Sequence, residues 1–219
     1  MRKIVPALVI AALVAAPVAG HSQTLYSDGP IDGTQNGWTI DFGLQAANTF
    51  TLASSSTIGS ANFALWNIPG DTTSQVSWAV LSNNPGVPGY SVLASGDAAT
   101  TSVFDFSNGV GYDVSTYTIS LPSIALDAGT YWFELDNAVV TNGDYTFWDM
   151  NGGPSQNWDS AMGYNASDQY TGGTNNPANT FSILGTGSPV PEPASMALLG
   201  AALVGIGAIR RKRASRKSD

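Results

Sequence analysis

The C-terminal segment from Pro189 to Asp219 constrains this chain more than any other stretch. Its uncharged run from Ala194 to Ile209 has 16 residues, which make roughly 24 Å of α-helix at about 1.5 Å per residue. That length falls a little short of the ~30 Å hydrocarbon core of a bilayer, but basic side chains at its end can snorkel to the interface. A buried core helix would show a polar face, and this run has none. The run therefore predicts a transmembrane helix at 194–209.

Charged and proline-rich residues flank the apolar run on its two sides. Before it stand Pro191, Glu192 and Pro193, and after it comes a basic tail at 210–217. Cationic residues next to a membrane span stay on the cytoplasmic side. The predicted stop-transfer signal consists of Arg210, Arg211, Lys212 and Arg213.

This order of motif, apolar run and basic cluster resembles the PEP-CTERM sorting signal of Gram-negative bacteria. The resemblance implies recognition by an exosortase, an integral-membrane cysteine protease-like enzyme that cuts near the motif Pro191, Glu192, Pro193. The same tail is sometimes labelled an ice-binding protein C-terminal domain, but this label refers to the sorting signal and does not imply ice binding. We therefore expect residues 186–219 to be a linker and sorting signal. The protein would be exported from a Gram-negative-type cell, anchored transiently in the inner membrane, and then placed on the cell surface or in the extracellular matrix.

The N-terminus has the pattern of a secretory signal peptide. Arg2 and Lys3 precede an apolar run at 4–18, which ends in small residues. We expect a signal peptide at 1–20, with cleavage before His21 by the secretion machinery. A retained membrane anchor is the alternative.

The segment between the two signals contains no Lys or Arg. Two of the eight basic residues stand at positions 2 and 3 and the other six at 210–217, whereas 15 of the 16 acidic residues lie between His21 and Ile209. Phosphate contacts need cationic side chains, so nucleic acid is excluded as a partner. Metal cations or basic partners could be attracted, although acidity also simply keeps an exported protein soluble. The chain has no cysteine, which excludes disulfides, thiol chemistry and thiolate metal sites.

The composition of the same segment predicts an all-β fold. Runs that alternate in polarity or are rich in β-branched and aromatic residues recur every 8–15 residues, separated by Asn-Gly and Pro-Gly turns. About ten short strands of this kind indicate a two-sheet β-sandwich, with a jelly roll as the preferred topology, in one domain at 25–185. The predicted strands are 38–42, 50–52, 61–66, 76–81, 90–94, 102–106, 113–121, 130–135, 144–149 and 180–184.

Two runs of the body are also similar to the bodies of many PEP-CTERM proteins. They are Phe63–Asp71 followed by Leu93-Ala94-Ser95-Gly96, and Ala128–Leu135 followed by Phe147-Trp148-Asp149. This similarity implies a β-sandwich of uncharacterised activity and brings no function with it.

The residues offer little for catalysis. The only histidine, His21, stands at the expected cleavage point, so a Ser-His-Asp triad is excluded. A body without lysine cannot perform lysine-dependent covalent chemistry. A glycosidase carboxylate pair remains conceivable with Glu134 and an aspartate, but aspartates are commonest at turns and caps. We therefore expect a protein that is not an enzyme.

The stretch from Asn142 to Asp159 carries the strongest candidate binding residues. Calcium takes six to eight oxygen ligands, and a weak calcium site is predicted at Asp144, Asp149, Asn151 and Asp159; no other cofactor is expected. Asp28 and Asp32, each followed by glycine, form a second and weaker candidate, and a turn-rich loop without metal is the alternative. Trp148 and Trp158 flank the Gly/Asn loop and are expected to be exposed, where they could stack on sugar rings. Trp38, Trp66 and Trp78 lie in alternating runs and are expected in the core.

Two functions from different classes follow from these observations. The first is an exported, non-catalytic component of the cell surface or extracellular matrix. The second is a carbohydrate-binding module that acts on exopolysaccharide, aided by calcium or not. A glycoside hydrolase ranks behind both.

Overall fold

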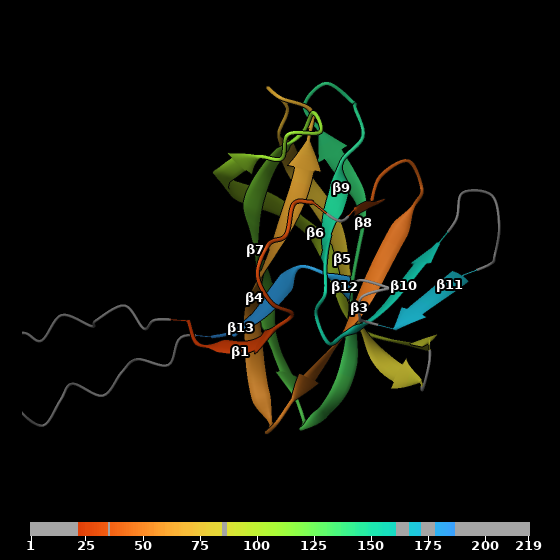
Figure 1. Cartoon of the computed structure of the whole chain (residues 1–219). Helices are drawn as coiled ribbons and strands as arrows, with labels where there is room; N and C mark the ends of the chain where they lie inside the picture. The colour runs from red at the N-terminus through yellow and green to blue at the C-terminus, as the bar shows by residue number, and fades with distance from the viewer. Residues whose placement is uncertain (1–21, 35, 85–86, 161–166, 172–177, 187–219) are drawn as a thin grey trace, which may run out of the picture. The chain divides into compact units, whose positions relative to one another are not determined.

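The computed structural model describes residues 22–34, 36–84, 87–160, 167–171 and 178–186 (Figure 1). Every regular element in these ranges is a β-strand, so the all-β prediction is confirmed, and no membrane-spanning helix is found within them. The predicted signal peptide and the whole sorting signal lie outside the described residues. The strands are β1 (Thr24–Ser27), β2 (Gly37–Thr39), β3 (Gln45–Leu52), β4 (Ser56–Asn67), β5 (Thr73–Asn84), β6 (Val87–Ser107), β7 (Asp113–Leu126), β8 (Gly129–Val140), β9 (Phe147–Asn151), β10 (Gln156–Ser160), β11 (Ser167–Thr171), β12 (Ala178–Asn179) and β13 (Phe181–Gly185).

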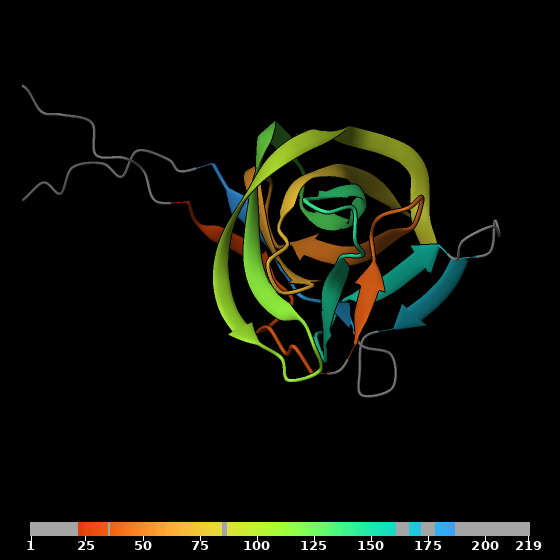
Figure 2. The ribbon, with the colours of Figure 1, turned by 90° about the horizontal axis from the view of Figure 1, so that it is seen from above.

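The strands pair into one strongly curled antiparallel sheet. Its order is β1-β13-β4-β7-β6-β5-β8-β3-β10-β11, and β9 joins β2, β4 and β12 beside this path. Seen from above, the strands of Ser22–Thr186, which form one compact unit, wrap around a common interior (Figure 2). The predicted division into two separate sheets is not confirmed, because hydrogen-bonded pairing continues from one layer into the other.

The continuity comes from β6, a strand of 21 residues. Its first part pairs with β5 as far as Ala99, and its second part pairs with β7 from Thr100 onward. The sequence predicted two strands here, because the intervening run around Gly96 is small and polar. At Gly96 the strand passes close to the Trp78 indole, which an added Cβ would meet at 3.5 Å, an ordinary contact distance. The small residues of this run therefore continue the strand instead of ending it.

Large side chains from alternate positions fill the interior. Phe63 and Leu65 of β4, Trp78 of β5, and Phe133 and Leu135 of β8 all point into one cluster. Such alternation is what a sheet with one buried face requires. Trp66 and Trp78 are buried as predicted, Trp66 in a smaller cluster on the outer side, and Trp38 packs against the main core.

The Asn-Gly pairs behave differently from one another. Gly109 and Gly143 have positive φ angles of 74° and 75° and lie in the turns that follow β6 and β8, as predicted. Gly37 instead begins β2, where an added Cβ would lie 2.7 Å from the Phe147 Cβ. Close strand approach, and not a turn, therefore requires glycine at position 37.

Candidate functional site

The predicted calcium ligand Asp149 is the centre of a buried hydrogen-bond network. Its Oδ1 accepts from the Gly33 backbone N–H at 2.8 Å and from the Trp66 indole at 2.7 Å. Its Oδ2 accepts from the Asp32 backbone N–H at 3.1 Å and from the Thr180 hydroxyl at 2.7 Å. Burial raises the pKa of Asp149, and these four donors oppose that rise. The carboxylate thus ties three distant segments to β9.

Asn151 holds the N-terminal loop in the same way. Its amide nitrogen donates to the backbone carbonyls of Asp28 and Pro30, both at 3.0 Å, and its Oδ1 accepts from the Gly153 N–H at 2.9 Å. A Cβ on Gly153 would lie 2.2 Å from the Asp28 carbonyl oxygen. The Asn-Gly-Gly run, which suggested a metal loop, therefore serves a close contact between two chain segments.

Asp28 is fully buried and has only neutral partners. Its Oδ1 accepts from the Tyr26 hydroxyl at 2.8 Å and the Ser155 N–H at 3.0 Å, and its Oδ2 accepts from the Ser155 hydroxyl at 3.1 Å. Burial raises the pKa of Asp28 to about 6, because no Lys or Arg exists in this part of the chain to compensate the charge.

The other two predicted calcium ligands lie in different surroundings. Asp144 is exposed in the loop after β8 and lines a cavity of about 340 Å³ together with Asp41 and Asn137, whereas Asp159 is buried on β10. No group of three or more Asp, Glu, His or Cys side chains within the described ranges is placed to hold a metal ion. Calcium at these four residues stays a prediction, and at Asp149 and Asn151 a metal would compete with the hydrogen bonds above.

A buried amide network joins strands that are far apart in the sheet order. The Oδ1 of Asn179 on β12 accepts from the side-chain amides of Asn48 on β3 and Asn157 on β10, at 3.1 and 2.5 Å. The Asn179 amide nitrogen donates to the Trp148 carbonyl at 2.9 Å. Side chains therefore link β9 and β12 to β3 and β10, where no backbone pairing joins them among the described strands.

The prediction that Trp148 is exposed was wrong. Its ring is fully buried in the core, edge-on to Phe133 with ring centres 6.2 Å apart, and its indole N–H donates to the Thr180 carbonyl at 2.9 Å. The residue lies inside β9, which pairs with β2, β4 and β12, so neighbouring strands enclose it. A fully buried ring cannot stack on a sugar.

Trp158 is only half-buried, and it lies on the outer side of the sheet. It packs against a small apolar cluster made of Ala47, Ala79, Leu81 and Trp132. In the strand register Trp158 stands opposite Ala47, which stands opposite Glu134. An aromatic ring and a carboxyl group therefore share this outer side, with one small residue between them.

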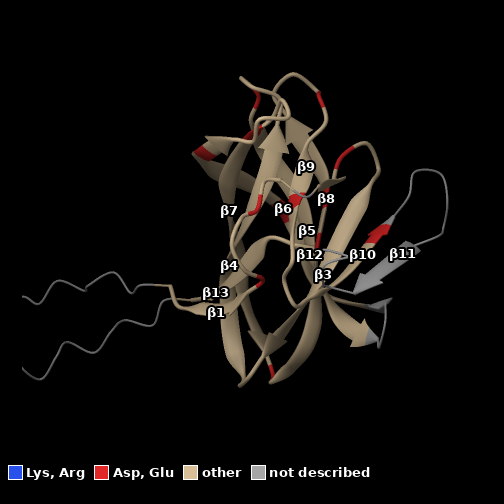
Figure 3. Cartoon of the chain, viewed as in Figure 1, with Lys and Arg blue, Asp and Glu red and all other residues tan. Residues whose placement is uncertain are grey.

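From the sequence, Glu134 was a candidate only for a glycosidase carboxylate pair, and not for a binding site beside Trp158. The pKa of Glu134 is raised to about 7, mainly by burial and to a smaller extent by the charge of Asp136. The pKa of Asp136 is raised as well, mainly by burial and then by the charge of Asp97. The Ser77 hydroxyl donates to Asp97 at 2.6 Å. A carboxyl group with such a pKa both donates and accepts hydrogen bonds near neutral pH, which suits sugar hydroxyls. Among the described residues, no Lys or Arg compensates the negative charge of the Asp and Glu residues (Figure 3).

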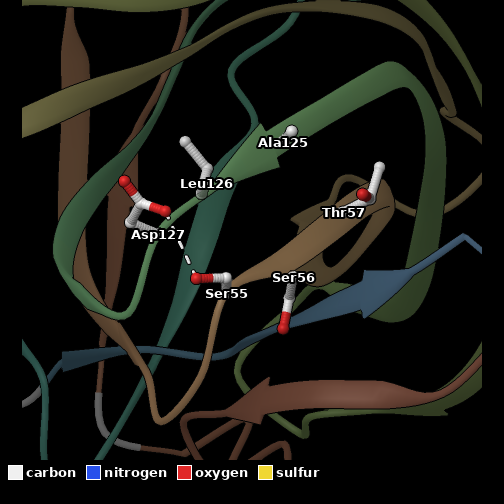
Figure 4. Close-up of a pocket in the computed structure, with 6 residues that line it drawn as sticks. All are labelled: Ser55, Ser56, Thr57, Ala125, Leu126 and Asp127. Atoms are coloured by element: carbon white, nitrogen blue, oxygen red, sulfur yellow. Dashed lines mark hydrogen bonds between the residues drawn. The ribbon is translucent and has the colours of Figure 1, made fainter.

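A cavity of about 350 Å³ lies where β4 begins and β7 ends (Figure 4). Its lining is Ser55, Ser56, Thr57, Ala125, Leu126 and Asp127. The Ser55 hydroxyl donates to Asp127 at 3.2 Å. A serine paired with a carboxylate lacks the intervening base that would activate it as a nucleophile.

Comparison with known proteins identifies the C-terminal signal. The model of the PEP-CTERM protein-sorting motif matches residues 189–213, which include Pro191, Glu192 and Pro193 and the predicted stop-transfer residues at 210–213. The recognition of this motif from the sequence is confirmed. The motif supports sorting by an exosortase and therefore an exported protein that is processed at the membrane. No curated protein sequence matches the chain.

Proposed function

We propose that this protein is a non-catalytic structural component of the cell surface or extracellular matrix of a Gram-negative-type cell. Its signal peptide would be removed before His21, the helix at 194–209 would hold it in the inner membrane, and exosortase would then cut near Pro191-Glu192-Pro193. The observation that carries the proposal is the sorting motif at 189–213.

The chemistry of the body supports a structural role. Two of its buried carboxylates, Asp28 and Asp149, are occupied by hydrogen bonds that hold the N-terminal loop, β9 and β10 together. The body offers no lysine and no cysteine for covalent catalysis. The cavity beside Ser55 has no histidine that could serve as a base, because the only one in the chain is His21.

Mass spectrometry of the protein from membrane, cell-surface and medium fractions tests the sorting step. We expect the surface or medium form to begin near His21 and to end close to Glu192. Replacing Pro191, Glu192 and Pro193 together by alanine should leave an intact C-terminus in the membrane fraction, whereas Asp105→Ala, on the exposed strand β6, should be processed normally. An intact Asp219 in every fraction of the wild type would contradict the proposal.

A carbohydrate-binding module is the second candidate function, and the outer side around Trp158 favours it. Aromatic faces stack on apolar faces of sugar rings, while carboxyl groups such as Glu134 bind their hydroxyls. A single half-buried ring beside small alanines would give a shallow platform, which suits a polymer more than a free monosaccharide.

Affinity electrophoresis in gels cast with the host's exopolysaccharide tests this second function. Trp158→Ala should weaken the retardation, because the stacking ring is lost. Tyr145→Ala removes another exposed aromatic ring, in the β8–β9 loop, and is the matched control. Retardation that is equal in the two variants would exclude the Trp158 surface.

A further inference from the structure

The second part of β6 is an open edge of the sheet. From Thr100 to Ser107 the strand pairs with β7 on one side, and no described strand pairs with its other side. In the view from above, β6 runs along the outside of the molecule (Figure 2). An open edge presents backbone N–H and C=O groups that can pair with another strand.

Apolar side chains are exposed on both faces of the sheet along this edge. Val103 is 69% exposed and stands in register with Thr116 and Ala64, on the outer side of the sheet. Phe104 is 60% exposed and stands in register with Ser115 and Leu65, on the core side. Neighbouring exposed apolar residues on an open edge strand, such as Val103 and Phe104, mark an interaction surface.

Before Asp105, from Thr100 to Phe104, this edge carries no charged residue and no proline, two of the features that commonly protect an edge strand from pairing. Natural edge strands commonly carry lysine, and this body contains none. The single charge between Thr100 and Ser107 is Asp105, whose Oδ2 accepts a hydrogen bond from the Thr116 hydroxyl at 2.8 Å. A bulge at Asp105 interrupts the ladder with β7, which resumes at Phe106 and Ser107, so the uninterrupted stretch runs from Thr100 to Phe104.

We propose that a second copy of this chain binds this edge, with its own β6 antiparallel and the two-fold axis at Val103. This register puts Val103 opposite Val103, Ser102 opposite Phe104, and Thr101 opposite Asp105. Cross-strand apolar pairs stabilise such a pairing, and like charges directly opposite would oppose it. In this register no carboxylate faces another carboxylate, and each Asp105 meets a threonine hydroxyl.

Charge distinguishes a second copy from a basic partner. Two bodies without cations repel one another at long range, and salt screens that repulsion, since the Debye length falls from about 30 Å at 0.01 M to about 8 Å at 0.15 M. Dimerisation with a copy should therefore strengthen as salt rises. Binding of a basic peptide at the same edge would weaken instead.

Cross-linking tests the register directly, because the full chain has no cysteine of its own. In detergent under mild oxidation, Val103→Cys should form a disulfide-linked dimer at least tenfold faster than Val110→Cys. Both side chains are 69% exposed, but Val110 lies in the turn after β6. Equal rates for the two variants would overturn the proposed register.

Sedimentation of the full chain in detergent over a concentration series tests the association itself. Val103→Glu puts two carboxylates directly opposite one another and should raise the dimer dissociation constant at least tenfold, whereas Val110→Glu should leave it unchanged. A wild type that is monomeric throughout, a dimer that Val103→Glu does not weaken, or a dimer that salt dissociates would each refute pairing with a copy. These outcomes do not depend on exosortase cleavage, so they leave the sorting proposal untouched.

Discussion

Replacing the buried Asp28 by asparagine should stabilise this protein at neutral pH. An asparagine amide fits the existing partners: its Oδ1 can accept from the Tyr26 hydroxyl and the Ser155 N–H, as the Asp28 Oδ1 does at 2.8 and 3.0 Å. Its Nδ2 then faces the Ser155 oxygen, which can accept that hydrogen bond. Ser155 can direct its own proton to the Asn48 Oδ1, 3.3 Å away. The substitution therefore removes a buried charge without orphaning a donor.

The size of the effect follows from the pKa of Asp28, which burial raises from 3.8 to about 6. Between these two values the folded state binds more protons than the unfolded state, so the free energy of unfolding falls as pH rises. Two pKa units correspond to about 3 kcal/mol, the upper limit of the stability that Asp28 costs the protein at pH 7.5. At pH 4 the wild-type carboxyl is protonated in the folded state, and the variant should gain little.

Urea unfolding of the full chain in detergent, followed by tryptophan fluorescence between pH 4 and 8, measures this difference. We expect Asp28→Asn to gain about 2 to 3 kcal/mol at pH 7.5 and less than about 1 kcal/mol at pH 4. Asp105→Asn, on the exposed part of β6, controls for the loss of one negative charge. A variant that is no more stable than the wild type at pH 7.5, or whose gain does not grow with pH, would refute the reasoning.

Four further outcomes follow from the same contacts. Asp149→Asn should destabilise by about 2 kcal/mol or more at pH 7.5, because an amide nitrogen would face a backbone N–H donor; an unchanged urea midpoint would contradict this. The free energy of unfolding of the wild type should fall between about pH 4.5 and 7 because the pKa of Glu134 is raised, and Glu134→Gln should make this fall smaller. The expected difference, measured by unfolding at several pH values, is about 1 to 2 kcal/mol after allowing for the partial exposure of Glu134. Trp158→Ala should weaken exopolysaccharide retardation more than Tyr145→Ala does. If the predicted ligands at 144–159 bind calcium, a chelator should lower the melting temperature of the protein. An unchanged melting temperature would exclude calcium binding there.

The strands were predictable from the sequence where apolar and polar residues alternate along a short run. The pairing of these strands into one sheet was not predictable. The run 113–121 was predicted as a strand and lies inside β7, because its inward positions, such as Tyr117 and Ile119, are apolar at every second residue. The short strands β1, β10, β11 and β12 were missed. β10 and β12 carry buried asparagines whose partners are up to 131 residues away. A polar residue that is buried by a distant strand gives no local signal of burial.

The candidate site shows the same limit. Asp149 and Trp148 are neighbours in a run rich in Gly, Asn and Asp, and composition alone favoured a metal loop with an exposed ring. The hydrogen-bond donors of Asp149 are 31 to 117 residues away in sequence, so its structural role emerges only when β9 is placed among β2, β4 and β12. The half-buried Trp158 stays a surface candidate, but its neighbour Glu134 was weighed only as a catalytic acid. The register that brings Glu134 near Trp158 passes through β3, which no local pattern encodes.

One property of the body, the absence of Lys and Arg, connects its stability to its surface. The buried carboxylates Asp28 and Asp149 are stabilised only by neutral hydroxyl, indole and backbone N–H donors, which offset the effect of burial only in part, so their pKa values stay raised. The same absence removes lysine from the open edge of β6, where it would oppose pairing. Both effects depend on the medium outside the cell: a mildly acidic one protonates Asp28 and favours the folded body, and a salty one screens the repulsion between copies. At the proposed surface location, the body would therefore be most stable at mildly acidic pH and would pair more readily as salt rises.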